Sequence, residues 1–485
     1  MSYPVDYHQL STTDMERLHA GAMAILADPG LKIMEPTLLK CLEKAGATVD
    51  HDTQVVKFPE ELIMETLAGI KADKAGGLTM PVLNGVIASR TDGTLQAKFG
   101  GACCSYYDWD ARATREPNNT DVITMLRLGE AIPDVAHVGN PVIYMKTDDG
   151  DRIPPHLKPI KTAQLVAKNT SRPYSCEVWS VEGLEFQIEI GCIVRGGWDN
   201  YLADPIFITA KETISPLQFP REDAEVLMAL AKKGLPCTVV PMPISGASCP
   251  ITPASNVAMA AAEILGVFAA LRSYEPKARV AAGVITGVMD MSGGNALFTE
   301  PMSILQDRMV SQLFADFYDM DLGVGTGYID SAIPGTQSVI EKTCKMLSSF
   351  QCGKTNYPVG IVEGGKTFCP EQAILDLEVA RTIHKTFGPM PVNDDTLAID
   401  VIRNAGIAGN VLADEHTVMN FRDVLHLTDL FDRSSTCTED MLDRASRKWK
   451  DIVASATPFE LDGNKADEID KVVEKAEKYF ETHQP

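Results

Sequence analysis

The feature that most constrains the fold is an alternation of short apolar runs with longer helical segments, which begins near residue 118. Runs of this kind, rich in β-branched residues, predict strands, and the stretches between them carry a helical period. Continuous apolar strands are typical of a parallel sheet that is covered on both faces. The eight predicted strands are residues 135–145, 174–179, 205–210, 237–241, 280–285, 322–327, 359–362 and 409–413. The predicted helices between them include residues 221–233, 254–272, 301–318, 335–349 and 370–387.

The number of strand–helix units favours one α/β architecture over another. Eight units over roughly 300 residues predict a (β/α)8 TIM barrel. An open Rossmann-like sheet is the alternative, and it requires a GxGxxG turn after its first strand. The glycine run at residues 323–327 is too short for that turn and lies late in the chain. The barrel is therefore the predicted fold.

The segments on either side of the repeat predict a three-part organisation. Residues 1–75 are helical in pattern, with Thr12 or Thr13 as the first cap and Pro29-Gly30 as the first stop. Residues 78–115 are short, turn-rich and alternating, which indicates a small β element. We therefore expect three parts: an N-terminal helical cap with a small β element at 1–117, the barrel at 118–438, and a C-terminal helical extension at 439–485.

Charge and cysteine content exclude some classes of partner. The 485-residue chain has a net charge of −22, which disfavours binding to nucleic acid and to anionic membranes. Its eleven cysteines include no CxxC pair, as expected in a reducing compartment. The first residues show no signal peptide, and Glu263 interrupts the most apolar predicted helix. These features predict a cytoplasmic protein.

A glycine- and aromatic-rich segment stands out at residues 99–110. Glycine lets the backbone approach a ligand closely, and Tyr106, Tyr107 and Trp109 offer ring faces to a cation. An ordinary hairpin that packs its aromatic residues into a core explains the same pattern equally well. The segment is thus predicted either as part of a binding site or as core.

In a barrel, the chemistry lies at the carboxyl ends of the strands. The residues at the predicted ends are rich in aromatic, carboxylate and hydroxyl groups: Tyr144, Glu177, Trp179, Glu212, Ser215, Pro243, Ser245, Thr286, Thr326, Tyr328, Glu363, Glu415 and His416. Lys211 is the nearest candidate for a Schiff base, and it is equally consistent with a solvent-facing lysine. Glu177 and Glu212 are either a catalytic pair or partners of basic residues. An aromatic and acidic pocket suits a quaternary ammonium group, which cannot donate hydrogen bonds.

At this point the chain resembles the trimethylamine methyltransferase family, specifically its members that lack pyrrolysine. The resemblance spans nearly the whole sequence and rests on the order and spacing of several blocks. Those blocks are Phe99-Gly-Gly with Asp108-Trp-Asp, Arg115, Asp121 and Ile132-Pro133-Asp134; residues 246–252 with 260–265; residues 413–417 with Asn420-Phe-Arg422 and Asp432-Arg433; and Leu31-Lys-Ile with residues 46–50.

The resemblance implies a barrel enzyme that moves a methyl group from an amine to Co(I) of a corrinoid held by a separate protein. Pyrrolysine-containing members act on trimethylamine. Here the corresponding loop, residues 327–334, carries ordinary residues, with the pyrrolysine position near Ser331 and Ala332. The substrate implied is therefore a quaternary amine, with glycine betaine as the first choice and proline betaine, carnitine or another betaine as alternatives. No tightly bound cofactor or metal is expected.

The resemblance, together with the predicted strand ends, suggests a role for each of several residues. Glu177, Glu212 and His416 are the catalytic candidates, although His416 is also consistent with a structural residue. Corrinoid approach is expected at Gly325, Thr326, Gly327 and Gly364-Gly365. Donors to a substrate carboxylate are sought among Lys366, His416 and Arg308. The cage candidates, for each of which core packing is the alternative, are Tyr106, Tyr107, Trp109, Tyr144, Trp179, Tyr328 and Phe350.

Two other function classes remain open at this stage. A barrel lyase or aldolase predicts an essential strand-end lysine or a divalent metal. A non-catalytic binding protein for a quaternary amine predicts tight binding without turnover. A homo-oligomer is expected for a barrel of this size.

Overall fold

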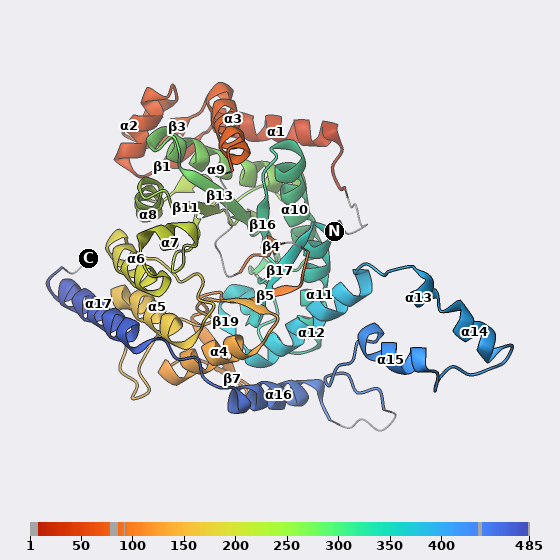
Figure 1. Cartoon of the computed structure of the whole chain (residues 1–485). Coiled ribbons are helices and arrows are strands. Elements are labelled where there is room, and N and C mark those ends of the chain that lie inside the picture. Colours follow the sequence, from red (N-terminus) through yellow and green to blue (C-terminus); the bar gives the residue numbers. More distant parts are fainter. Residues whose placement is uncertain (1–7, 78–85, 92, 435–438, 484–485) are drawn as a thin grey trace.

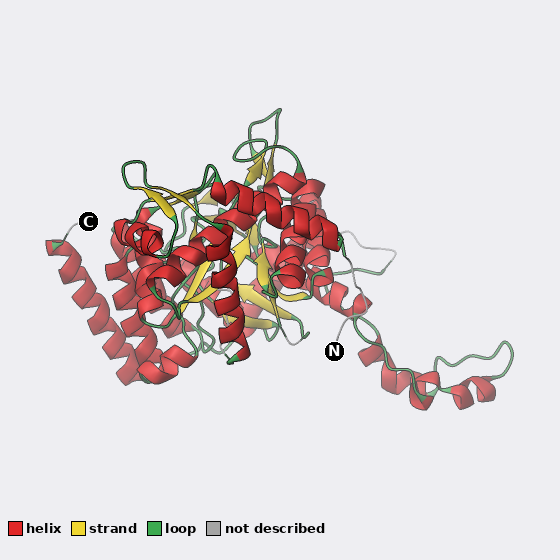
Figure 2. Ribbon diagram, turned by 90° about the horizontal axis from the view of Figure 1, so that it is seen from above, coloured by secondary structure: helices red, strands yellow, loops and turns green. Residues whose placement is uncertain are grey.

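The computed structural model describes residues 8–77, 86–91, 93–434 and 439–483. It is a mixed α/β structure in which helices surround short central strands (Figures 1 and 2). The helices are α1 (Thr12–Ala27), α2 (Pro36–Lys44), α3 (Glu60–Ala75), α4 (Asn119–Ala131), α5 (Lys158–Asn169), α6 (Val181–Arg195), α7 (Trp198–Ala203), α8 (Arg221–Lys232), α9 (Pro253–Tyr274), α10 (Pro301–Gln312), α11 (Thr336–Gln351), α12 (Pro370–Phe387), α13 (Asp394–Leu397), α14 (Ile399–Ala405), α15 (Glu415–Val424), α16 (Met441–Ser455) and α17 (Gly463–Thr482).

Four strands form an all-parallel sheet in the order β16-β13-β11-β9. Their bounds are β9 (Lys211–Glu212), β11 (Pro236–Val240), β13 (Arg279–Val284) and β16 (Leu322–Val324). Every residue of β11 and β16 is buried, as expected for parallel strands covered on both faces. The register pairs Val239 with Lys211 and Ala282 with Leu322.

A second sheet has the order β4-β17-β5-β8. It contains β4 (Ser89–Arg90), β5 (Gln96–Phe99), β8 (Val135–Val138) and β17 (Lys354–Pro358), of which β17, β5 and β8 are mutually parallel. Isolated pairings continue from its edges. Val138 bridges Pro173, the Phe207 N–H donates to the Tyr174 carbonyl at 2.8 Å, and Ala88 bridges Val324 of β16.

Three smaller sheets complete the structure. One has the order β12 (Ile244–Ser245), β14 (Gly287–Met289), β15 (Ala296–Leu297). Another has the order β18 (Ile361–Val362), β19 (Thr367–Phe368), β6 (Ser105–Asp108), β7 (Ala113–Arg115). The third has the order β10 (Gln218–Phe219), β1 (Leu31–Ile33), β3 (Val55–Lys57), β2 (Thr48–Asp50), and it ties the N-terminal segment to the chain after β9.

The predicted helices are confirmed more closely than the strands. Helix α12 has the predicted bounds, and the predicted helices at 221–233, 254–272 and 335–349 match α8, α9 and α11 to within a few residues. The first cap is Ser11 rather than Thr12 or Thr13. Segment 301–318 divides into α10 and a π-helical segment, Leu313–Phe317.

Three strand predictions are wrong: residues 174–179, 205–210 and 409–413 form no strand. The first two segments are extended and make only isolated pairings, and the third lies between α14 and α15. The eighth strand of the repeat is instead β17, which precedes the predicted 359–362 run and carries Lys354, Thr355 and Asn356 as buried residues. A search for apolar runs passes over a strand of this composition. In addition, β5 pairs with β8 and β17, so part of the expected small β element shares a sheet with the repeat.

Helix α9 is the core element on which the N-terminal helices pack. Among the described residues it is the one helix long and apolar enough to cross a membrane, and 83% of its apolar window is buried inside the molecule. A Cβ on Gly266 would lie 2.9 Å from Leu31 and 3.1 Å from Leu26, so the glycine permits close packing. The predicted C-terminal helices are confirmed as α16, which packs on α4 and α12, and α17, which packs on α5 and α6.

Candidate functional site

Three of the predicted residues come together beyond the carboxyl ends of the strands. Glu177 follows the segment that pairs with β8, Glu212 ends β9, and Tyr328 follows β16. They are close enough for the two carboxylates to raise the pKa of the Tyr328 phenol, after burial as the larger cause. These three residues are called the carboxylate–tyrosine cluster below.

The two carboxylates resist simultaneous ionisation. Glu212 reaches solvent on one side but is otherwise surrounded by protein, and this desolvation together with Glu177 raises its pKa to about 8. Burial also raises the pKa of Glu177. Within the described chain, neither carboxylate forms an ion pair. Near pH 7 the pair therefore carries less than its full negative charge.

Lys211 is committed to the structure and is not free for Schiff-base chemistry. Its Nζ lies 2.7 Å from Asp223 Oδ1 and donates to the Val178 carbonyl at 2.9 Å. Burial lowers the pKa of this ammonium, but Asp223, with smaller contributions from Glu177 and Glu212, more than offsets that effect and the pKa is raised overall. The alternative of a solvent-facing lysine is also wrong, because Lys211 is buried.

Tyr328 stands against a second aromatic ring that the sequence did not indicate. Phe298, which follows the short strand β15, meets Tyr328 edge to face with a centroid distance of 5.1 Å. A Cβ on Gly365 would lie 2.8 Å from the Tyr328 ring, so this position accepts only glycine without displacing the tyrosine. The predicted glycine pair at 364–365 thus has a packing function beside the cluster.

Two carboxylates, Asp330 and Glu341, fix the loop that carries Tyr328. Asp330 accepts from the backbone N–H of Phe298 at 2.5 Å and of Thr299 at 2.9 Å. Glu341 Oε2, on α11, accepts from the backbone N–H groups of Asp330 and Ser331, each at 2.9 Å. The loop therefore holds Tyr328 and Phe298 in one unit.

Buried Lys342, on α11, fixes the start of the same loop. Its Nζ lies 3.5 Å from Asp376 Oδ2 and donates to the carbonyls of Gly327 at 3.2 Å and Ile361 at 3.3 Å. Lys342 and Asp376 have no exposed side-chain surface. Burial lowers the pKa of the lysine and raises that of the aspartate, and the charge of each group opposes the shift of the other.

Glu263, the acid that interrupts the most apolar helix, has a positioning function. It accepts from the hydroxyls of Thr213 at 2.5 Å and Ser215 at 2.8 Å, and from the Leu217 N–H at 2.8 Å. These donors lie in the loop that follows Glu212. The carboxylate on α9 therefore holds the end of β9. In the sequence, this function is visible only as an acidic residue in an otherwise apolar helix.

In the glycine- and aromatic-rich segment, Tyr106 and Tyr107 are buried, whereas Trp109 is partly exposed and packs against α16. The Arg112 guanidinium lies 3.1 Å from the Trp109 ring centroid, and the Arg115 guanidinium lies 4.7 Å from the Tyr106 centroid. Trp109 Nε1 also donates to Asp443 of α16 at 3.1 Å, and Tyr107 is buried. The cations that meet these rings are thus the chain's own arginines.

The other predicted residues are dispersed. Tyr144 and Trp179 lie in loops, half-buried and 39% exposed respectively. Phe350 is buried between α11 and α12, where it contacts His384 and Phe387. The expectation that His416 ends a strand is wrong: it lies on α15, which projects from the body, and its Nε2 is 3.0 Å from the Asp395 carbonyl (Figure 1).

The Gly325–Gly327 turn is filled by protein rather than open. A Cβ on Gly325 would lie 3.1 Å from Ile285, and one on Gly327 would lie 2.7 Å from the Val86 carbonyl oxygen. Thr326 is buried and its hydroxyl is hydrogen-bonded to Ser349. These residues therefore pack the strand end, and the room that was expected here for a corrinoid is taken up by protein.

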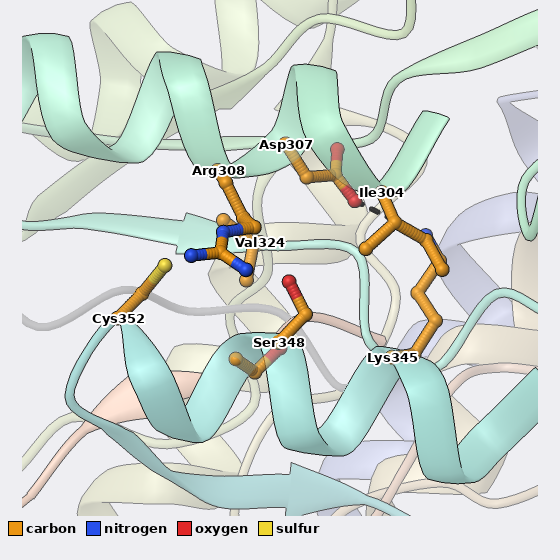
Figure 3. Close-up of a pocket in the computed structure, with 8 residues that line it drawn as sticks. Ile304, Asp307, Arg308, Val324, Lys345, Ser348 and Cys352 are labelled. Atoms are coloured by element: carbon orange, nitrogen blue, oxygen red, sulfur yellow. Dashed lines mark hydrogen bonds and ion pairs between the residues drawn. The ribbon is translucent and has the colours of Figure 1, made fainter. Parts of the chain in front are cut away.

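A small cavity between α10 and α11 is not part of the site. It is about 10 Å³, at the lower limit for one water molecule, and Val324 of β16 contributes to its lining (Figure 3). Lys345 crosses it to reach Asp307 at 3.1 Å, and its Nζ also donates to the Gly325 carbonyl at 3.1 Å. In the part of the chain that the structure describes, no group of three or more His, Cys, Asp or Glu side chains is arranged to hold a metal ion.

Comparisons with known proteins cover nearly the whole chain. Residues 3–480 match the family model described as trimethylamine methyltransferase (MTTB). The trimethylamine methyltransferase MttB of Desulfitobacterium hafniense (strain DSM 10664 / DCB-2) is 28% identical over 474 residues, covering 96% of this chain and 93% of the relative. The glycine betaine methyltransferase of Desulfitobacterium hafniense (strain Y51) is 23% identical over 463 residues, covering 94% of each.

A solved structure agrees in fold. The crystal structure of the hydroxylamine complex of MtmB matches with a TM-score of 0.50 and 12% identity, over 99% of this chain and 90% of that one. At this identity the likeness concerns the fold alone.

Proposed function

This chain belongs to the trimethylamine methyltransferase (MTTB) family, and from this premise we propose that it moves a methyl group from a quaternary amine to the corrinoid of a separate protein. Glycine betaine is the first substrate proposed, with proline betaine, carnitine or another betaine as alternatives. The relatives named above are methyltransferases, and one acts on glycine betaine. Ordinary residues at 327–334 support a member that lacks pyrrolysine.

The observation that carries the proposal is the carboxylate–tyrosine cluster. Neither of its two carboxylates lies within ion-pair distance of a basic group in the described chain, the nearby Lys211 being paired with Asp223, and its Tyr328 ring packs against Phe298. Such a site favours a cation that makes no directional hydrogen bonds. Because the pKa of Glu212 is about 8, the net negative charge of the pair near pH 7 is moderate.

Moderate charge suits the chemistry of methyl transfer. The bond between the methyl carbon and nitrogen breaks with its electrons staying on nitrogen, so a neutral tertiary amine leaves and no proton is transferred. The ammonium charge disappears in this step, and a site that bound it with two full carboxylates would stabilise the substrate over the transition state. We infer that Glu177 and Glu212 orient the cation and that Tyr328 and Phe298 exclude water from it.

A closed (β/α)8 barrel is part of the proposal. The parallel pairings in both sheets, with the bridges at Val138–Pro173 and Ala88–Val324 and the Tyr174–Phe207 hydrogen bond, support closure of the two sheets into one ring. The cluster would then lie at the mouth of the barrel. We also propose a cytoplasmic location for the protein.

Exposed apolar side chains in the loops after the strands fit docking of a corrinoid protein. Ile214, Ile251, Met291 and Ile333 are each more than half exposed and follow β9, β12, β14 and β16. Exposed apolar groups of this kind mark surfaces that are covered by a partner. The corrinoid, when it is presented there, supplies a Co(I) nucleophile that accepts the methyl group.

The test is a single-turnover assay with Co(I) cobalamin and a panel of quaternary and tertiary amines. We expect consumption of Co(I) with one betaine, with the matching demethylated amine as product, and none with trimethylamine. The double variant Glu177→Gln/Glu212→Gln should weaken substrate binding by about tenfold or more, equivalent to about 1.4 kcal/mol, because it removes the negative charge that either single variant retains. Glu468→Gln, on the exposed surface of α17, is the matched control. Absence of reaction with every amine, even after addition of the cognate corrinoid protein, would contradict the proposal.

The two competing functions make different predictions in the same assay. A binding protein would retain the betaine and produce no demethylated amine. A lyase would need Lys211 as a free amine, and the contacts of Lys211 with Asp223 and Val178 argue against that role.

A further inference from the structure

We propose that residues 388–434 form a dimerisation arm that packs against the same arm of a second copy of this chain. The segment leaves the body after α12, carries α13, α14 and α15, and returns at α16; Figures 1 and 2 show it projecting away from the rest of the molecule. None of the residues in these three helices is buried. The inference does not depend on the proposed methyl transfer.

The arm concentrates the exposed apolar surface of the molecule. Of the 23 large hydrophobic residues that are exposed in the described chain, 14 lie between residues 390 and 431. Ile407 is fully exposed, Leu412 is 76% exposed and Met419 is 71% exposed. Isolated exposed apolar residues are ordinary, but this density on so short a segment indicates a surface that is covered in the working protein.

The root of the arm is fixed to the body. His426 Nε2 lies 2.5 Å from Glu378 Oε1 on α12, Lys385 donates to the Asp423 carbonyl, and Arg444 of α16 donates to the Leu430 carbonyl at 3.0 Å. The arm thus leaves the body in a set direction, with its apolar residues already presented. Such preorganisation reduces the entropic cost of association.

The position of the root argues against the corrinoid protein as the occupant. A groove at the root is lined by residues 93–95, which directly precede β5, together with residues of α12 and 422–429. The root therefore lies at the amino ends of the parallel strands. The carboxylate–tyrosine cluster follows their carboxyl ends, so a partner that serves the cluster must approach from the other side of the sheets.

Composition and charge select a second copy over a membrane. Residues 388–434 carry eight acidic residues against three arginines and no lysine, which opposes binding to an anionic bilayer. The exposed apolar residues are mainly Ile, Leu, Val and Met, as in permanent rather than transient interfaces. Covering them would bury on the order of 800 Å² per copy, the amount in a standard stable interface. Two identical arms pair reciprocally and close the assembly as a twofold dimer.

The test is the mass of the full-length protein in solution by light scattering at about 20 µM. We expect the wild type at twice the 52.7 kDa chain mass, or as a larger assembly built from such dimers. The double variant Ile402→Asp/Met419→Asp should halve that mass. Ile340→Asp is the matched control, because Ile340 is 59% exposed on α11 and Ile402 is 60% exposed on α14; it should leave the mass unchanged.

A second measurement guards against misfolding of the double variant. Unchanged thermal unfolding of the body, with faster amide hydrogen exchange in α14 and α15, is the expected result, because helices this short do not persist alone. A wild type of 52.7 kDa, or a doubled mass that survives the double substitution, would overturn the proposal. So would a monomer whose arm binds a corrinoid protein. Methyl-transfer activity is scored separately, so failure of either proposal is recognised on its own.

Discussion

At the scale of single residues, the chemistry of the molecule follows from which carboxylates have a paired basic group or hydrogen-bond donors. Glu177 and Glu212 are left without an ionic partner in the described chain, whereas Asp376, Asp223 and Glu263 are fully engaged by lysines or hydrogen-bond donors. Ionising both Glu177 and Glu212 costs free energy, and groups whose pKa is raised in this way are typical of functional sites.

The pKa of Glu212 makes stability depend on pH. Because its pKa is about 8 in the folded chain and near the ordinary value of 4.5 when unfolded, the folded state holds the extra proton between these values. Stability attributable to this group is therefore lost as the pH rises from about 4.5 through 8. We expect Glu212→Gln to raise the unfolding temperature at pH 9, by about 1–2 °C, and to leave it unchanged at pH 4. The check is a thermal melt of both proteins at each pH, with Glu468→Gln alongside; an equal gain at both pH values would contradict this account.

At the scale of elements, charged residues inside helices fix the loops that carry the site. Helix α9 contributes Glu263 to the loop after β9, and α11 contributes Glu341 and Lys342 to the loop that carries Tyr328. Each of these residues interrupts an otherwise apolar or amphipathic pattern, and each satisfies backbone groups that would otherwise be buried without partners.

Loss of the Glu263 carboxylate should destabilise the chain. Glu263→Ala leaves three donors, from Thr213, Ser215 and Leu217, without their acceptor, and we expect a loss of about 2–4 kcal/mol. Chemical denaturation measures the change, and Glu474→Ala on the exposed face of α17 is the control. Glu263→Gln retains one acceptor oxygen and should cost less. If alanine and glutamine cost the same, the hydrogen bonds are not the cause.

The Lys342–Asp376 pair should behave as one unit. Lys342→Met leaves a buried carboxylate uncompensated and should cost about 3–5 kcal/mol. Adding Asp376→Asn removes that charge, and the double variant should recover part of the loss. The measurement is a double-mutant cycle by denaturation, and additive losses would show that the pair does not interact.

At the scale of the whole molecule, the two C-terminal helices hold the helical layer together. Helix α17 buries Ile469, Val472, Val473, Ala476 and Phe480 against α5 and α6, far from it in sequence. Helix α16 joins α4 to α12 in the same way. The C-terminal extension is therefore part of the packed body and not an appendage.

Truncation of one C-terminal side chain should loosen distant helices. Phe480 is 4% exposed, with its ring centroid 4.6 Å from that of His156 and 6.2 Å from that of Phe186. We expect Phe480→Ala to cost about 3–5 kcal/mol and to accelerate amide exchange in α5 and α6. Glu474→Ala, on the exposed side of the same helix, should do neither. Faster exchange confined to α17 would show that it contributes nothing to the body.

The sequence by itself determined most helix bounds, five of the eight strand positions and the places of Glu212 and Tyr328 at or after strands β9 and β16, because these depend on local periodicity and chain order. The tertiary structure decided the rest. Strand β17 is polar and buried, the run at 409–413 has no partner strand, and the rings of Tyr106 and Trp109 face arginines from the chain itself. Phe298 reaches Tyr328 only through the loop held by Asp330. Such outcomes depend on which distant groups meet, and pairing across the chain is a property of the packed molecule that no local pattern encodes.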